Sequence, residues 1–233
     1  MKKILLSLLL LVLAFTFVAC DTSTVPETTE SDTKSESTET AQSDADAKEA
    51  EYEAADSAYK VLLEAHELCV DVMDSIYDAW FFAIYEADDY SSAQSRFDAF
   101  CSRANLDYDE ALDALNEVLQ SMGYSEPTGT QQLEGLTDFN VTLTVVEHIY
   151  TNNGTYSKID TYLSNAKSFI KSLTNKYADY TGYTTLKSYY SELSAYAEFC
   201  QSATGSFSQL KTTIDTYETN LRNYKNELSF IFD

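Results

Sequence analysis

The sequence predicts an all-α protein, an elongated antiparallel helical bundle of about five to seven helices that follows a disordered acidic linker. The 233 residues include only six Gly and two Pro, which suits helices with short connections better than a sandwich of short strands. Apolar side chains recur three and four residues apart over almost all of residues 48–233, which is the spacing of one helical face.

The first nineteen residues are typical of a secretion signal. Lys2 and Lys3 give a positive start, and residues 4–18 form an apolar stretch too short for a comfortable membrane anchor. Ordinary signal peptidase prefers small residues at the first and third positions before its cut, and Phe17 is the third residue before Cys20. A different kind of processing is therefore favoured.

The stretch Phe17-Val18-Ala19-Cys20 resembles the lipobox of bacterial lipoproteins, with Phe17 where leucine is usual. The resemblance implies cleavage before Cys20 and attachment of diacylglycerol to its thiol. Each buried methylene contributes about 0.8 kcal/mol, so two or more acyl chains such as palmitate hold a domain at a membrane almost permanently. We expect a lipid anchor at Cys20 on the extracytoplasmic face of the cell membrane; the alternative is a secreted protein with an ordinary thiol.

Residues 20–47 then form the linker. After the cysteine they are nearly all Ser, Thr, Asp, Glu and Ala, with Val25 as the only large aliphatic side chain. Such a segment cannot bury enough apolar surface to offset the entropy of ordering. As a flexible coil it would span on the order of 30 Å. We therefore divide the chain into a signal peptide (1–19), a linker (20–47) and a helical domain (48–233).

The domain begins with one long amphipathic helix. Its apolar stripe comprises Tyr52, Ala55, Tyr59, Leu62, His66, Cys69, Met73, Ile76, Trp80 and Ala83. The opposite face carries a row of carboxylates, namely Glu64, Glu67, Asp71, Asp74 and Asp78. Such a row could attract cations, but its place opposite the stripe favours a solvated face.

Shorter helices follow an interruption at residues 88–92. One spans about residues 97–104, and Asp107 begins the next as a helix cap, with Gly123 at its end. Residues 133–150 include the β-branched run VTLTVV and could form a strand. We predict a helix there, because the apolar residues keep helical spacing and no nearby segment offers a pairing strand.

The remaining apolar stripes predict helices over residues 156–177, 186–200 and 207–231. Gly205 either breaks the last two apart or bends one long helix. The segments after Gly154 and Gly205 align at an offset of 51 residues. Duplication of a helical pair and chance agreement between amphipathic helices both explain this alignment.

A second resemblance rests on the segment DAWFFAIYE (78–86), late in the first helix, and on a terminal helix opened by Gly205-Ser206-Phe207. Together they resemble an uncharacterised family of secreted or lipid-anchored helical proteins of Gram-positive bacteria. The resemblance implies only the fold class and the location, because it brings no catalytic or binding residues.

The formal net charge of −23 limits which binding partners the chain is expected to have. Nucleic acid and anionic lipid headgroups are bound through Lys and Arg, so we expect no nucleic-acid partner. Cationic ligands, metal ions and simple solubility remain compatible with this acidity.

His66 and Cys69 share one helical face and could ligate a metal together with Cys101, Cys200 or His148. A buried histidine beside a buried thiol is the plainer interpretation, so we assign no metal and no cofactor. If Cys20 is lipidated, three cysteines remain, which is an odd number. The simplest interpretation is that all three are buried thiols, and the alternative is one disulfide with one free thiol.

The sequence contains no nucleophile elbow, P-loop, dinucleotide fingerprint or His-Glu-x-x-His motif, so no catalytic residue is assigned. Aromatic residues are abundant, with 18 Tyr and 12 Phe. Some spread too far around their helices to face one core, and exposed aromatic rings can bind sugars or proteins. The candidate partner-binding residues are Trp80, Phe81, Phe82, Tyr85, Tyr189 and Tyr190.

We therefore expect a membrane-anchored, extracytoplasmic and non-enzymatic binding or structural module of the cell envelope, with an envelope protein or a saccharide as partner. Two alternatives stay open. The first is an envelope hydrolase that uses dispersed carboxylates, which requires a cleft with convergent and perturbed Asp or Glu. The second is capture of a cationic solute or metal.

Overall fold

The computed structural model describes residues 36–125, 127–173 and 182–232, and every regular element within these ranges is helical. The α-helices are α1 (Glu36–Phe81), α2 (Ala93–Arg103), α3 (Tyr108–Ser121), α4 (Gly129–Gly135), α5 (Phe139–Asn152), α6 (Thr155–Ser172), α7 (Tyr183–Cys200) and α8 (Phe207–Phe232). A π-helical turn, η1 (Phe82–Glu86), and a 3-10 turn, η2 (Ala87–Asp89), continue α1. The prediction of an all-α helical bundle is confirmed.

Residues 42–233 form one compact unit. The signal peptide, Cys20 and residues 21–35 lie outside the described residues. Residues 36–47, which the sequence places in the linker, are helical. They contain no Gly or Pro, and extending an existing helix avoids the cost of nucleating a new one. No helix within the described ranges is both long and apolar enough to cross a membrane.

The segment 133–150 is helical, as predicted, but it is divided between α4 and α5, so the described residues contain more helices than expected. Each of the two helices has its own cap. Thr128 forms a capping box with Gln131 at the start of α4. Asp138 accepts a hydrogen bond from the amide of Asn140 at the start of α5. These local caps let the chain turn between two short helices.

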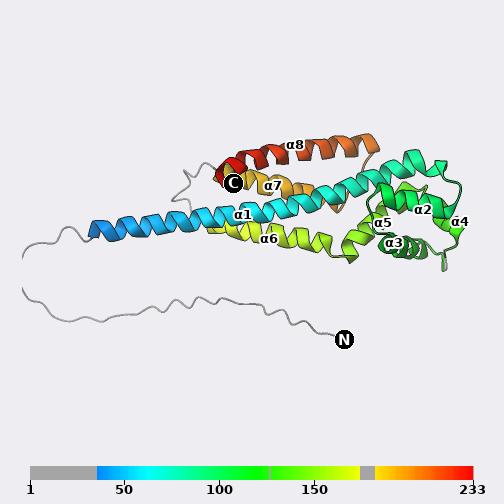
Figure 1. The fold of residues 1–233 in the computed structure, drawn as a ribbon, viewed down its shortest axis with the longest axis horizontal. Helices are drawn as coiled ribbons and strands as arrows, with labels where there is room; N and C mark the ends of the chain where they lie inside the picture. Colours follow the sequence, from blue (N-terminus) through cyan, green and yellow to red (C-terminus); the bar gives the residue numbers. More distant parts are fainter. Residues whose placement is uncertain (1–35, 126, 174–181, 233) are drawn as a thin grey trace, which may run out of the picture. The chain divides into compact units, whose positions relative to one another are not determined.

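Helices α1, α6, α7 and α8 lie side by side (Figure 1). Helix α8 runs antiparallel to α1, because Tyr59 stacks on Phe232 near the end of α8 and Tyr77 packs on Phe207 at its start. Helix α6 is antiparallel to α7, since the hydroxyl of Tyr156 donates to the carbonyl of Cys200 at 3.3 Å.

Helices α2 to α5 gather around the last turns of α1 and the π turn (Figure 1). Phe82 is fully buried, and its ring centroid lies 5.7 Å from that of Phe100 on α2. Trp80 stacks on Phe139 at the start of α5. One continuous apolar core therefore joins both halves of the unit.

Gly205 separates α7 from α8, so it breaks the helix rather than bending it. Its φ is +114°, and Gly154, which precedes α6, has a φ of +79°. Both values lie in the region that favours glycine, because a Cβ atom there is strained. The 51-residue repeat stays a prediction.

Candidate functional site

The structure separates the six predicted partner-binding residues. Trp80, Phe81 and Tyr85 come together at the end of α1. Phe82 instead turns into the core, and Tyr189 is fully buried in the middle of the bundle. Tyr190 is half-buried on α7. The candidate surface is therefore confined to the end of α1 and the helices beside it.

At this end lies an aromatic cluster formed by Trp80, Phe81, Tyr85, Phe139 and Phe207. Trp80 and Phe139 are nearly parallel, with centroids 5.4 Å apart and an interplanar angle of 9°. Tyr85 lies 4.9 Å from Phe81 and 5.7 Å from Phe207, measured between ring centroids. The rings thus come from α1 and the adjoining η1, and from α5 and α8, which are distant from them in sequence.

The cluster is open to solvent on one side. Tyr85 is 59% exposed, Phe139 is 38% exposed and the neighbouring Ile84 is 45% exposed. Phe81 and Phe207 are half-buried, and Trp80 lies buried beneath Phe139 and Phe207. The buried rings give the exposed ones a rigid support.

The π turn explains why these aromatic residues diverge. A π-helical turn contains an additional residue, which shifts the following side chains around the helix axis. Phe82 and Ala83 then face the core, while Ile84 and Tyr85 face solvent. Regular helical spacing cannot predict this shift, although the run of aromatic residues signalled that one core could not hold them all.

Charged groups lie beside the cluster. The guanidinium of Arg103 sits over the ring of Phe81, 4.5 Å from its centroid. The same group donates to Asp78 through Nε and to Glu86 through Nη1, each at 3.0 Å. Apolar rings and polar hydrogen-bonding groups therefore occur together at this surface. No local sequence pattern links Arg103, Phe139 and Phe207 to this surface, because only the tertiary fold brings them to the end of α1.

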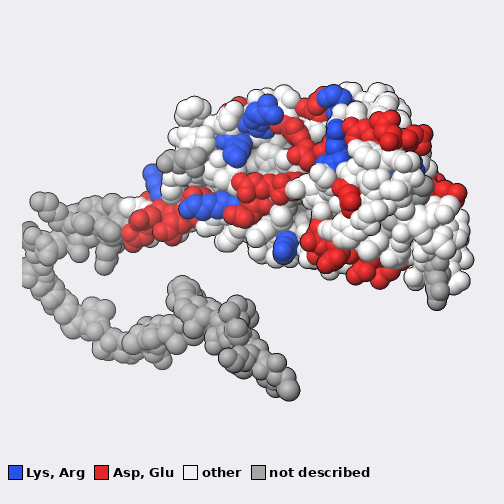
Figure 2. Space-filling model, turned by 45° about the vertical axis from the view of Figure 1, so that its right-hand side comes forward, with Lys and Arg blue, Asp and Glu red and all other residues white. Residues whose placement is uncertain are grey.

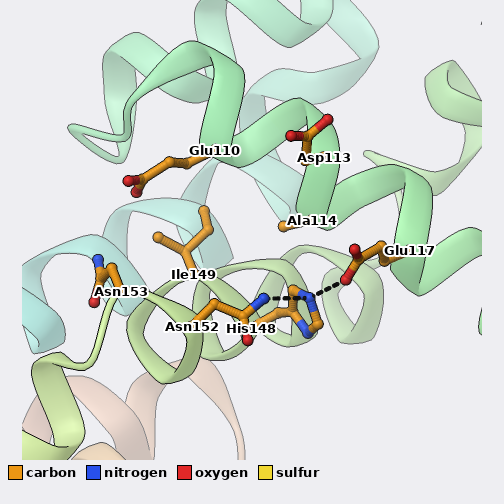
Figure 3. Close-up of a pocket in the computed structure, with 8 residues that line it drawn as sticks. All are labelled: Glu110, Asp113, Ala114, Glu117, His148, Ile149, Asn152 and Asn153. Carbon is orange, nitrogen blue, oxygen red and sulfur yellow. Dashed lines mark hydrogen bonds and ion pairs between the residues drawn. The ribbon is translucent and has the colours of Figure 1, made fainter. Parts of the chain in front are cut away.

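A groove of about 270 Å³ lies between α3 and α5 (Figure 3). Glu110, Asp113 and Glu117 line it from α3. From α5, Nε2 of His148 contacts the carboxylate of Glu117 and lies 2.8 Å from Nδ2 of Asn152. The groove can attract cations, but no group of three or more His, Cys, Asp or Glu within the described ranges has a geometry that could hold a metal ion.

A smaller groove of about 190 Å³ lies between α1 and α8. Asp74 and Glu218 face each other across it, and Lys211 pairs with Asp215 at 3.0 Å. Partial burial raises the pKa of both Asp74 and Glu218. Repulsion by neighbouring carboxylates raises both pKa values further. Of the predicted carboxylate row on α1, Glu64, Glu67, Asp71 and Asp74 are exposed.

His66 is held inside the bundle by a hydrogen bond. Its Nδ1 lies 2.8 Å from the hydroxyl of Tyr189 on α7. Burial lowers the pKa of His66 to about 4, with smaller effects from Lys225 and Arg222, so the ring is neutral at pH 7. Cys69, Cys101 and Cys200 are buried free thiols. Of these, the thiol of Cys200 contacts Cys69, whereas Cys101 lies on α2 near Asp98 and Asp107.

Comparisons of the chain with protein-family models, with curated proteins and with solved structures found no match. The resemblances described from the sequence therefore stay predictions, and only the geometry of the described residues bears on function.

Proposed function

We propose that this chain is a lipid-anchored, extracytoplasmic and non-enzymatic binding module of the cell envelope, and that the aromatic cluster is its binding surface. The main support for this binding surface is that Tyr85 and Phe139 are exposed to solvent while they pack on buried or half-buried aromatic rings. The location rests on the lipobox-like segment at Cys20 and on the polar segment that follows it.

The size of the exposed surface favours a saccharide over a protein. Ile84, Tyr85 and Phe139 together expose on the order of 300 Å² of apolar side chain. A stable protein interface usually buries about 800 Å² on each partner. One or two sugar rings fit the smaller area.

The chemistry at the surface agrees with that ligand. The C–H faces of a sugar ring can lie on an aromatic ring, and its hydroxyl groups need donors and acceptors nearby. Tyr85 supplies such a ring, while Arg103 and Glu86 supply polar groups next to Phe81. The net charge of −23 disfavours anionic polymers, so the expected ligand is a neutral or amino sugar.

Capture of a cationic solute is the second candidate. The observation that favours it is the convergence of three carboxylates on the groove between α3 and α5. A hydrolase is less well supported, because the paired carboxylates with raised pKa values, Asp74 and Glu218, line a small groove beside the Lys211–Asp215 ion pair.

Binding of N-acetylglucosamine oligomers, measured by isothermal titration calorimetry, tests the saccharide proposal. We expect Tyr85→Ala to weaken binding about tenfold, because one aromatic contact and its buried area are lost. Phe230→Ala is the matched control. Phe230 is 91% exposed but lies near the other end of α8 from Phe207, about 35 Å along the helix axis.

An equal loss of affinity in Tyr85→Ala and Phe230→Ala would contradict a specific site at the aromatic cluster. Undetectable binding of neutral and amino sugars to the unmodified chain would contradict the ligand class. Strong binding of a protein partner that is abolished by Tyr85→Ala would replace the saccharide with a protein.

The anchor has its own test, namely incorporation of radiolabelled fatty acid during expression in bacteria. We expect the label to enter the full chain and to be lost in Cys20→Ala, while Cys101→Ala keeps it. Unchanged labelling of Cys20→Ala would refute the anchor.

A further inference from the structure

Cys69 and Cys200 meet inside the bundle. Cys69 lies on α1 and Cys200 is the last residue of α7, and both side chains are fully buried. The thiol of Cys200 donates to the carbonyl oxygen of Cys69 at 3.6 Å, and Cys69 is near enough to raise the pKa of the Cys200 thiol. The two cysteines are 131 positions apart in the sequence, so only the tertiary fold brings them together.

We propose that Cys69 and Cys200 are joined by a disulfide in the exported protein, and that Cys101 stays a free thiol. This inference rests on the proposed extracytoplasmic location, because disulfides form and persist in oxidising compartments. It goes beyond the binding function, since it assigns a covalent link between α1 and α7.

The position of Cys200 favours such a link. The helix ends there, and a turn follows that leads to Gly205, whose φ is +114°. The backbone at the end of a helix can adjust to the spacing of a disulfide more easily than a residue in its middle. Among the described residues, Cys101 is a free thiol on α2, and the charged groups that act on it are Asp98 and Asp107.

The oxidation needs an external acceptor, for which a small disulfide such as oxidised glutathione suffices. One thiolate attacks the small disulfide and releases a thiol, and the second thiolate then displaces the other half of the reagent. In total, the two cysteines lose two protons and two electrons, one S–S bond forms, and the reagent becomes two thiols.

The exchange belongs to the folding process rather than to the finished fold. Burial raises the pKa of Cys200 well above its ordinary value, and the neighbouring Cys69 raises it further. The reactive thiolate is therefore scarce once the bundle has closed. Folding in the presence of the oxidant is the condition under which the bond forms.

The test uses the full chain with Cys20→Ala, made under reducing conditions and refolded in a mixture of reduced and oxidised glutathione. After denaturation, free thiols are alkylated with iodoacetamide and counted by mass spectrometry. We expect one alkylated cysteine, Cys101, and a disulfide-linked peptide pair that contains Cys69 and Cys200. Three alkylated cysteines, or a disulfide that includes Cys101, would overturn the proposal.

A second measurement needs no count of thiols. Adding a reductant should lower the thermal midpoint of the oxidised protein by about 10 °C, because the bond closes a long loop in the unfolded chain. Cys200→Ser should show no shift with reductant, and Cys101→Ser should keep the full shift. An oxidised protein that melts at the same temperature with and without reductant would contradict the stabilising link. Refolding requires no export, so failure of the lipid-labelling experiment would leave these results unaffected.

Discussion

At the scale of single residues, Asp74 and Glu218 show how neighbouring carboxylates on an acidic surface lower the stability of the fold. They face each other between α1 and α8, and the described charges near them include Asp71 and Asp78 on α1 and Lys211, Asp215 and Arg222 on α8. Burial and like charges raise the pKa of both carboxyl groups, while Lys211 and Arg222 lower that of Glu218. The folded protein therefore binds protons at these positions more tightly than the unfolded chain does.

The sign of the pH effect follows from this difference. Where the folded pKa exceeds the unfolded value, ionisation costs stability, and the cost is complete above the folded pKa. It disappears below the ordinary pKa values of 3.8 for Asp74 and 4.5 for Glu218. We expect Asp74→Asn to raise the thermal midpoint at pH 7 by on the order of 1 °C, since the group is partly exposed.

The measurement is thermal unfolding followed by circular dichroism at pH 7 and at pH 3. The gain should be present at pH 7 and absent at pH 3. Glu64→Gln, which removes an exposed carboxylate from the same helix, controls for the general loss of negative charge. A gain that is equal for both variants, or equal at both pH values, would argue against the local repulsion.

The sequence contained only part of this information about individual residues. His66 is on an apolar stripe, and its burial was predictable from that position. Its partner, the hydroxyl of Tyr189, was not, because no local spacing relates a residue of α1 to one of α7. The same reason explains why the contact between Cys69 and Cys200 required the structure.

At the scale of helices, sequence signals predicted the features that depend only on neighbouring residues, such as helix caps and helical spacing. Asp107 was predicted to start a helix, and its carboxylate accepts from the amides of Asp109 and Glu110 at 3.0 and 3.1 Å. Helical spacing also identified residues 133–150 as helix despite their β-branched side chains, because burial of one face outweighs intrinsic propensity. These signals need only a few neighbouring residues.

Local sequence signals do not predict the π turn, because its additional residue is related to tertiary packing. With this residue, Phe82 contacts Tyr90 and Phe100, while Trp80 stays stacked on Phe139. A sequence pattern with a period of 3.6 residues places Phe82 and Tyr85 without this shift. The candidate aromatic surface was therefore predicted to lie near residues 80–85, but its members on α5 and α8 were not.

At the scale of the whole molecule, charge is the dominant feature. Asp and Glu side chains are spread widely over the face shown in Figure 2, with smaller patches of Lys and Arg among them. The net charge of −23 means that repulsion opposes the compact state, and one continuous core must overcome this cost. Ion pairs offset it only locally, as where Arg103 joins Asp78 and Glu86.

This balance predicts that salt stabilises the protein. The distance over which charges act falls from about 30 Å in 0.01 M salt to about 3 Å in 1 M salt, so the repulsion is screened. We expect the thermal midpoint at pH 7 to rise by about 5 °C between these sodium chloride concentrations. At pH 4.2, close to the isoelectric point of the sequence, the rise should be much smaller because the net charge is near zero. An equal rise at both pH values would attribute the effect to the salt's action on apolar surface, and a falling midpoint at pH 7 would mean that the local ion pairs outweigh the net repulsion.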